Sequence, residues 1–360
     1  MAGSEPINVA DYERLAERRL EPGAHGYFAG GAGAERTLRD NVAAFGRRRL
    51  RPRVLVDVSR VSTATTVLGT PVSMPLLVAP VAFQRLVDPD GEVAMARAAA
   101  AVGTAMCLST LATSRPSEVA AGAPPGPRWF QLYCFRDRGV TRALIEEAVE
   151  HGFDAIVLTV DAPRAGRRER DLRTGFALPA DVSAPAVAAA VGSEEPITVK
   201  EVFDLVDPAL EWDDFAALAS DCRLPIVLKG VQTAEDGRLA VDHGAAAIVV
   251  SNHGGRQLDG VPASLDLLGE VVEAVAGRRE VLVDGGVRRG SDVAVALALG
   301  ARAVLAGRAP LWGLAVDGER GARRVLEILR SELELALTLL GCSSPDAVTA
   351  EHVRREPIFD

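Results

Sequence analysis

Short apolar runs recur along the chain, and each of them ends in polar residues or glycine. Each run has the length of a strand and is bounded by residues that favour turns. A continuous apolar run, without strict alternation, is typical of a strand buried on both faces, as in a parallel sheet. The pattern therefore predicts eight buried strands, within residues 75–80, 105–110, 128–133, 155–161, 225–231, 247–252, 280–286 and 303–308.

Helical patterns fill most of the intervals between these runs, and glycine follows several of them. Gly103, Gly152, Gly244 and Gly300 each come just after such a pattern, where a left-handed C-cap is expected. Strands that alternate with helices predict a (β/α)8 TIM barrel of the α/β class. The alternative, a doubly wound open sheet, would need a glycine fingerprint after its first strand, and the sequence has none there. The predicted helices span residues 91–102, 141–151, 234–243, 266–275 and 291–299.

The chain is expected to form a single domain over residues 1–360. Residues 1–60 predict helices that cap one end of the barrel, and residues 75–340 cover the barrel itself. The interval between the fourth and fifth strands is unusually long, and its middle, residues 183–195, is rich in Ala, Ser and Pro. A segment of this kind is either disordered or an active-site lid. We expect a mobile lid within residues 164–212.

The composition argues against several classes of protein. A net charge of −9, from 40 basic and 49 acidic residues, is the opposite of what a general nucleic-acid binder needs. Cys107, Cys134, Cys222 and Cys342 form no CxxC pair, so we expect neither a disulfide framework nor a metal site. The polar start lacks the apolar core of a signal peptide, and no apolar run reaches the roughly 18 residues of a membrane span. We therefore expect a soluble, cytoplasmic protein that binds neither nucleic acid nor a membrane.

Reactive side chains stand where the predicted strands end. In barrels of this class the active site lies at the carboxyl ends of the strands. Any one of these residues could be an ordinary loop residue or a hydrogen-bonded group of the core. Polar ends on nearly all the strands are hard to obtain from packing alone, and together they indicate one shared site. The residues are Ser109, Gln131, Tyr133, Thr159, Asp161, Lys229, Ser251, His253, Asp284 and Arg308.

Two segments that contain glycine follow the seventh and eighth predicted strands: residues 284–290 and the pair Gly307-Arg308. Barrels of this class place a phosphate at that point, against backbone N–H groups and the start of a helix. Glycine lets the backbone approach the anion closely, and arginine can hold it with a bidentate fork. Either segment alone could be an ordinary turn. Together they favour a cofactor that carries a phosphate.

A histidine in a glycine turn is the third candidate feature. Within residues 251–260, His253 precedes Gly254 and Gly255, and Arg256 follows on the same loop. A base beside an arginine suits a substrate with a carboxylate next to the carbon that is oxidised. The alternative is a surface histidine in an ordinary turn.

At these motifs the sequence resembles the FMN-dependent L-2-hydroxy acid oxidase and dehydrogenase family. The resemblance rests on SNHGGRQLDG at 251–260, LTVDAPRAGRRERD at 158–171, VLKGV at 227–231 and VDGGVRRGSDV at 283–293. It extends from about residue 11 to about residue 342. The family includes glycolate oxidase, lactate oxidase and mandelate dehydrogenase, and the resemblance implies a homo-oligomer (tetramer or octamer) that oxidises an L-2-hydroxy acid to the 2-oxo acid with FMN.

The resemblance also implies roles for individual residues. His253 is similar to the family's base, Asp161 to the carboxylate that orients it, and Tyr133 to the tyrosine that contacts the substrate hydroxyl. The substrate carboxylate would be bound by Tyr27, Arg168 and Arg256. On the cofactor side, the residues that resemble flavin, ribityl and phosphate contacts are Ala82, Ser109, Gln131, Thr159, Lys229, Ser251, Asp284, Gly286, Arg288, Gly307 and Arg308.

Some positions depart from the glycolate oxidase pattern. Val81 replaces a threonine, and Leu111 stands where a bulky tryptophan faces the substrate side chain. Leu111 leaves room for a larger substrate, although a role in core packing is equally open. The run VAPVAFQRL and the pair Trp129-Phe130 look more like the bacterial hydroxymandelate oxidases. The resemblance therefore favours an aromatic or medium-chain hydroxy acid.

The electron acceptor is expected to be oxygen, with hydrogen peroxide as the product. Two alternatives use the same motifs: a soluble dehydrogenase of the lactate or mandelate type with a quinone or other acceptor, and a decarboxylating lactate monooxygenase. A related FMN barrel that isomerises its substrate would not need both arginines. A catalytically silent flavoprotein would be expected to have lost His253 or Arg256, and both are present.

Overall fold

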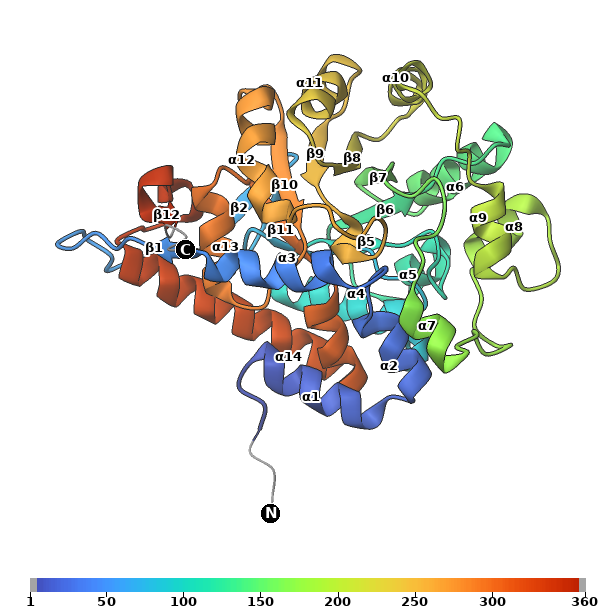
Figure 1. The fold of residues 1–360 in the computed structure, drawn as a ribbon, viewed down its shortest axis with the longest axis horizontal. Helices are drawn as coiled ribbons and strands as arrows, with labels where there is room; N and C mark the ends of the chain where they lie inside the picture. The colour runs from blue at the N-terminus through green and yellow to red at the C-terminus, as the bar shows by residue number, and fades with distance from the viewer. Residues whose placement is uncertain (1–4, 356–360) are drawn as a thin grey trace.

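Eight parallel strands close into a barrel in the computed structural model, which describes residues 5–355 (Figure 1). Each strand pairs with its sequence neighbours, and β11 closes the ring against β4. The predicted (β/α)8 barrel is confirmed. The strands are β4 (Leu76–Val78), β5 (Met106–Leu108), β6 (Arg128–Leu132), β7 (Ala155–Thr159), β8 (Ile226–Val231), β9 (Ala247–Val250), β10 (Glu280–Asp284) and β11 (Ala303–Ala306).

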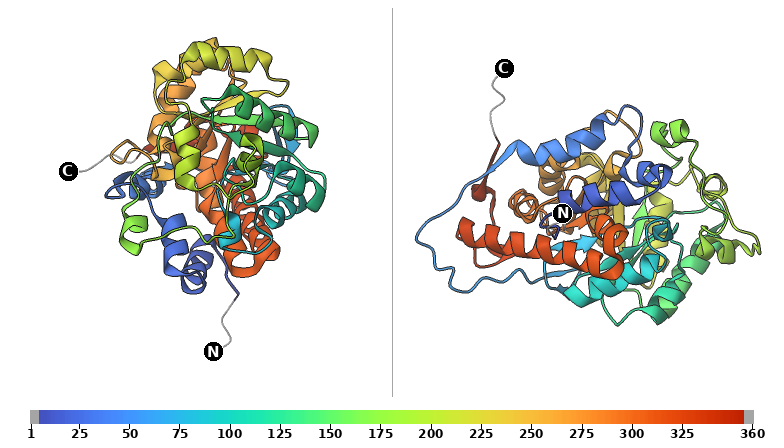
Figure 2. Two further views of the ribbon diagram at one scale, coloured as in Figure 1. Left: turned by 90° about the vertical axis from the view of Figure 1, so that its right-hand side faces the viewer. Right: turned by 90° about the horizontal axis from the view of Figure 1, so that it is seen from below.

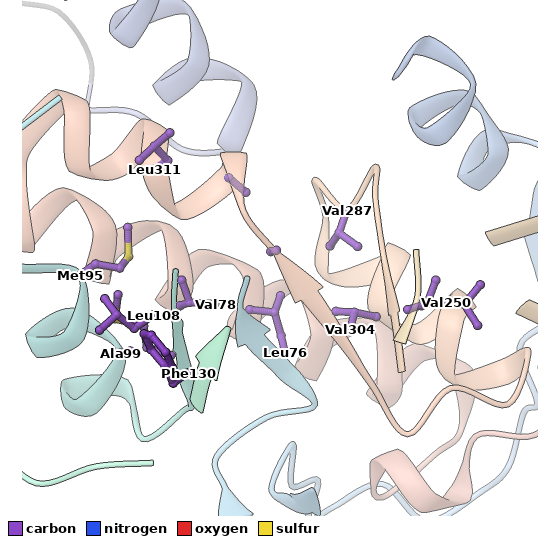
Figure 3. Close-up of a cluster of buried hydrophobic side chains, with 14 of the residues drawn as sticks. Leu76, Val78, Met95, Ala99, Leu108, Phe130, Val250, Val287, Val304 and Leu311 are labelled. Carbon is purple, nitrogen blue, oxygen red and sulfur yellow. The ribbon is translucent and has the colours of Figure 1, made fainter. Parts of the chain in front are cut away.

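Alternate residues of each strand point into the barrel, because successive side chains of a strand leave opposite faces. The inward residues form one buried cluster that includes Leu77, Cys107, Trp129, Val157, Val227, Val249, Leu282 and Leu305. The outward residues pack under the surrounding helices, as Leu76, Val78 and Leu108 do in the larger cluster shown in Figure 3. Both faces of every strand are therefore buried, which explains the continuous apolar runs.

Helices surround the barrel, and a helix separates each strand from the next (Figure 2). The predicted helices are present, with ends that shift by a few residues; α6 begins at Arg138 because Asp137 caps it. Gly103, Gly152, Gly244 and Gly300 all have positive φ, as expected at these helix ends. The helices that follow strands in this way are α4 (Gly91–Val102), α5 (Pro116–Gly122), α6 (Arg138–Glu150), α10 (Trp212–Asp221), α11 (Ala234–Asp242), α12 (Ser264–Val275), α13 (Gly290–Ala298) and α14 (Arg308–Leu340).

The two ends of the barrel are covered by different elements. A hairpin of β2 (Thr65–Val67) and β3 (Thr70–Val72) packs Val67 and Val72 against the barrel interior at the amino ends of the strands. The carboxyl ends face α2 (Pro22–Ala29) and α3 (Arg36–Gly46), preceded by α1 (Val9–Arg19), which runs beside α14 in Figure 1. A small antiparallel pair joins β1 (Arg48–Leu50), which follows α3, to β12 (Val353–Arg355), the last described strand.

The long interval between β7 and β8 contains three short helices before α10: α7 (Glu169–Thr174), α8 (Pro185–Val191) and α9 (Val199–Leu205). Residues 183–195, rich in Ala, Ser and Pro, include α8, whose Ala186 and Val187 are buried. The segment therefore has secondary structure of its own. It forms the right-hand side of the molecule in Figure 1.

All four cysteines are free thiols, three of them buried. Within residues 5–355, none of the helices combines the length and the apolar character that crossing a lipid bilayer would require.

Candidate active site

The alternation that fills the barrel also builds the site. Two residues beyond the inward-facing Cys107 comes Ser109, and in the same way Gln131 follows Trp129. Thr159, Lys229, Ser251 and Asp284 continue the inward face of their strands in the same manner. Since side chains repeat every second residue, these polar groups converge above the apolar interior.

One pocket at this end of the barrel collects almost all of the predicted site residues. Its empty volume is about 1060 Å³, including the part open to solvent, which is the size of a small-molecule site. Of the predicted residues only Asp161 and Ser251 do not line it, and both lie directly behind residues that do. The predicted residues in its wall are Tyr27, Ala82, Ser109, Leu111, Gln131, Tyr133, Thr159, Arg168, Lys229, His253, Arg256, Asp284, Gly286, Arg288, Gly307 and Arg308.

His253 is presented by a 3₁₀ turn over His253–Gly255 in which three consecutive residues have positive φ. Gly255 is required there, because a Cβ atom would lie 2.6 Å from the backbone nitrogen of Leu38. The backbone N–H of His253 donates to Ser251 Oγ at 3.0 Å, and Nδ1 lies 2.9 Å from Asp161 Oδ1. When Nδ1 donates to the carboxylate, Nε2 is the ring nitrogen that can accept a proton.

The electrostatics of this pair favour a neutral imidazole and an ionised carboxylate. Burial lowers the pKa of His253, and the nearby Lys229 lowers it further, while Asp161 opposes both effects. Burial would raise the pKa of Asp161, but His253 and Lys229 outweigh it and hold the pKa below its usual range. A base must be unprotonated before it acts, and this environment keeps His253 in that state.

Lys229 is a buried cation at the floor of the pocket. Its Nζ donates to Ser251 Oγ at 3.0 Å and lies 3.3 Å from Asp284 Oδ2. Burial disfavours the charged ammonium, but Asp284 and Asp161 outweigh this effect and raise the pKa of Lys229. Lys229 therefore carries a positive charge in the pocket at neutral pH.

Two arginines lie against the ring of Tyr27. The guanidinium carbons of Arg168 and Arg256 are 5.5 and 5.0 Å from the ring centroid, within cation–π range. Arg256 also donates to the carbonyl oxygens of Tyr27, at 2.6 Å, and Gly30, at 3.0 Å. Burial and the neighbouring Arg168 lower the pKa of Arg256 to about 10, which leaves it charged at neutral pH. Two adjacent cations form a natural site for a carboxylate.

The glycine segment after β10 packs closely against the N-terminal helix α3. Gly286 has a φ of 87°, and a Cβ atom there would lie 2.0 Å from the carbonyl oxygen of Asn41 in α3. Arg308 donates to the carbonyl oxygens of Phe28, Gly30 and Gly254. Three of its five N–H donors are thus engaged by the loops above the barrel, and the remaining two are available to a ligand.

Tyr133 is buried, and its ring lies 5.6 Å from that of Phe203. Burial and the nearby Asp161 raise the pKa of Tyr133 to about 12, so it remains a neutral phenol that can donate a hydrogen bond.

One wall of the pocket was not predicted from the sequence. Val199 and Phe203, both on α9, line it from the side of the long β7–β8 interval. The start of this helix could have been predicted from the sequence, because Thr198 and Glu201 form the S/T-x-x-E capping box that begins a helix. By contrast, Trp129 and Phe130 are buried in the barrel wall and do not line the pocket, so this pair does not contact a bound substrate directly.

A closed parallel barrel with a polar pocket at the carboxyl ends of its strands is the architecture of a barrel enzyme. A sequence model of the FMN-dependent dehydrogenases matches residues 16–355. An L-lactate oxidase of Nostoc sp. is 51% identical over 349 residues, which cover 94% of this chain and 96% of that protein. Glycolate oxidase 3 of Oryza sativa subsp. indica is 49% identical over 351 residues, which cover 96% of this chain and 95% of that protein.

Solved structures agree with these relatives. A mandelate oxidase mutant with (S)-mandelic acid has a TM-score of 0.88 at 44% identity, covering 97% of this chain and 98% of that one. An active chimera of (S)-mandelate dehydrogenase has a TM-score of 0.90 at 34% identity, covering 97% and 99%. The chain belongs to the FMN-dependent dehydrogenase family, whose members include 2-hydroxy acid oxidases, and FMN is its cofactor.

The pocket offers the groups that a flavin requires. Gln131 Nε2, Thr159 Oγ1 and Asp284 Oδ1 are buried in the wall of this pocket without a hydrogen-bond partner among the described residues. Gln131 Oε1 accepts from Ser109 Oγ and from the N–H of Thr110, which fixes the amide so that Nε2 is the free donor. Buried polar groups are rarely left unpaired, so these atoms fit a polar ligand such as the flavin and its ribityl chain.

Proposed function

We propose that this protein oxidises an L-2-hydroxy acid to the 2-oxo acid, with His253 as the base. The observation that carries the proposal is the 2.9 Å contact between His253 Nδ1 and Asp161 in a pocket that also contains Arg168 and Arg256. This contact leaves Nε2 free to accept a proton, and the arginines supply the charge that a substrate carboxylate needs.

In this proposal the substrate carboxylate binds to Arg168, Arg256 and the Tyr27 hydroxyl. Fixing the carboxylate orients the α-carbon and removes much of the entropic cost of bringing the reacting groups together. The hydroxyl of Tyr133 hydrogen-bonds the substrate hydroxyl, and Leu111 contacts the substrate side chain. The Tyr27 ring supports both arginines, so the carboxylate site is formed before the substrate arrives.

His253 Nε2 takes a proton from the substrate, and Asp161 stabilises the imidazolium that results. FMN supplies the two-electron acceptor when it is bound. Lys229 would provide a fixed positive charge in its site, and Ala82, Ser109, Gln131, Thr159, Ser251 and Asp284 would hold its ring and ribityl chain. Gly286, Arg288, Gly307 and Arg308 would bind the phosphate. Arg288 lines the pocket there, and its guanidinium is 3.8 Å from Glu13.

The proposal predicts that His253→Gln binds FMN but is reduced by substrate about 10²–10⁴-fold more slowly, the usual contribution of a general base. Anaerobic stopped-flow spectra of the flavin measure the reduction, and the visible spectrum of the purified variant measures FMN content. Reduction at the rate of the unaltered protein would exclude His253 as the base.

We further propose a substrate with an aromatic or medium-chain side group. Leu111, Val199 and Phe203 give the pocket an apolar wall, and the similar mandelate oxidase was solved with (S)-mandelic acid. Steady-state kinetics with glycolate, lactate, 2-hydroxyoctanoate and mandelate test this choice. A clear preference for glycolate would contradict it.

Oxygen is the proposed acceptor, with hydrogen peroxide as the product, because the relatives at 51% and 49% identity are named oxidases. Oxygen uptake and peroxide formation are to be compared with the reduction of an artificial dye. Dye reduction without oxygen uptake would indicate a dehydrogenase, and a decarboxylated acid among the products would indicate a monooxygenase.

The protein is also proposed to form a homo-oligomer. Val54 and Leu55 are 81% and 103% exposed. They belong to the segment between β1 and β2, part of which projects from the body of the molecule at the left of Figure 1. Leu335 and Leu339 are exposed beside the base of this segment. Apolar surface of this kind supports contact with another subunit.

A further inference from the structure

Glu92 is a buried carboxyl group without a basic partner. Its residue is 0% exposed, and no Lys, Arg or His of the described chain lies within ion-pair distance of it. It occupies the first turn of α4, on the outer side of the barrel wall, and it takes no part in the proposed reaction. Burying a carboxyl group is costly unless hydrogen bonds compensate, so Glu92 depends on the donors around it.

The hydrogen bonds of Glu92 connect two loops. Oε1 accepts from the backbone N–H of Gln84 at 3.0 Å and from that of Thr113 at 2.9 Å. Oε2 accepts from the hydroxyl of Thr113, and this hydroxyl in turn accepts from the N–H of Arg85 at 3.3 Å. Glu92 and Thr113 therefore satisfy backbone donors of the loop after β4 and of the loop after β5 at the same time.

These loops follow the seam with the shortest strand pairing in the barrel. β4 and β5 share a single residue pair, Val78 with Met106, whereas the other seams have three or four. Beyond the strands, the N–H of Phe83 donates to the carbonyl oxygen of Leu111 at 3.0 Å. The contacts of Glu92 thus continue the connection where regular pairing has stopped.

The same two loops form one wall of the pocket. Val81 and Ala82 line it just before Gln84, and Ser109 and Leu111 line it just before Thr113. The distance between these pairs sets the width of the pocket at this seam.

We propose that Glu92 is a positioning residue, which joins the β4 and β5 loops and fixes this wall of the pocket. The inference rests on the proposed binding of FMN and substrate in the pocket. Glutamine should replace Glu92 with a small loss, because its Oε1 keeps both backbone donors and its Nε2 can donate to Thr113 Oγ1, so that only the hydroxyl proton of Thr113 loses its acceptor. Leucine leaves the donors unpaired.

The test compares Glu92→Gln, Glu92→Leu and Thr113→Val with the unaltered protein and with Val271→Ala, a core substitution in α12 away from the pocket. FMN is titrated into each apoprotein, and hydrogen exchange is measured over residues 81–86 and 109–115. We expect Glu92→Leu to raise the FMN dissociation constant about tenfold and to accelerate exchange in both segments, the effect of losing one or two hydrogen bonds. Thr113→Val should raise the FMN dissociation constant by an intermediate factor, and Glu92→Gln should keep this constant within about threefold of that of the unaltered protein.

Val271→Ala controls for general destabilisation and should leave the FMN dissociation constant unchanged. The inference is overturned if Glu92→Leu and Thr113→Val behave like Val271→Ala, or if Glu92→Gln is as damaging as Glu92→Leu. If Glu92→Leu does not fold, the FMN dissociation constant and the hydrogen exchange of Thr113→Val alone test the inference. Failure of the unaltered apoprotein to bind FMN would instead contradict the proposed function.

Discussion

In the proposed reaction His253 acts only while its imidazole is neutral. Burial lowers its pKa from the usual value of about 6.5, and Asp161 limits that decrease through its charge and its hydrogen bond. The same carboxylate stabilises the imidazolium after the proton has moved. Asp161 therefore has opposite consequences before and after the chemical step. Before it, the higher pKa leaves a smaller fraction of His253 neutral at low pH; after it, the same interaction stabilises the imidazolium.

Replacing Asp161 with Asn separates these effects. Without the negative charge the pKa of His253 falls further, so the acid limb of the kcat/KM profile should move to lower pH. The plateau should fall by about 10²-fold or more, because the imidazolium loses its carboxylate. Flavin-reduction kinetics between pH 5 and 9 measure both. Asp154→Asn, which alters a carboxylate bonded to the N–H of Arg128 at 2.9 Å, should leave the profile unchanged. An acid limb that moved to higher pH would contradict the assigned pair.

The helix α3 packs closely against Gly286 in the loop after β10. Since a Cβ atom at Gly286 would lie 2.0 Å from Asn41, Gly286→Ala should displace either α3 or the loop after β10. Gly260 is a matched control, because its φ of 97° is similar and a Cβ atom there meets nothing within 4 Å. We expect Gly260→Ala to cost about 1 kcal/mol from backbone strain alone, and Gly286→Ala to cost roughly 1–3 kcal/mol more from the clash. Chemical denaturation measures the cost, and equal values would contradict this interpretation.

The helix α9 is expected to select the substrate side group. Phe203→Ala removes the ring that contacts Tyr133 and lines the apolar wall. We predict that KM for mandelate rises about tenfold while KM for lactate changes little, because only the larger side group reaches this wall. Leu205→Ala, on the same helix but 36% exposed, is the control. Equal changes for both substrates would indicate general loosening of α9.

Periodicity and strand-end chemistry predicted the barrel and most of the pocket. Both follow from one alternation: the inward face that carries Cys107 and Val227 within the barrel carries Ser109 and Lys229 at its end. Contacts between segments that are distant in the sequence produce no such periodic pattern, so they could not be predicted. The approach of Asn41 to Gly286 and the position of Phe203 depend on how α3 and α9 pack on the finished barrel. The burial of Glu92 could not be predicted from the sequence either, because a lone Glu in a helix normally faces solvent.

Across the molecule, the exposed loop that contains Leu55 and the nearby Leu339 are expected to contact another subunit. Replacing both with Glu should reduce the mass measured by light scattering at micromolar concentration, because a buried pair of charges is costly at an apolar interface. Leu172→Glu changes an equally apolar residue, 64% exposed on α7, and should leave the mass unchanged. A monomeric unaltered protein, or an unchanged mass for the double variant, would contradict this surface as the interface.

The N-terminal helices have a consequence for the time course of folding. Arg256 and Arg308 are partly buried and donate to carbonyl oxygens of residues 27–30, although these partners are separated by 229 and 280 positions in the sequence. During synthesis the first helices leave the ribosome long before the strands that complete their partners exist. Contacts of such long range must await the closure of a large loop, which slows folding. This pair of arginines should therefore reach its final position late. A nascent chain is expected to bind flavin only after nearly all of it has left the ribosome.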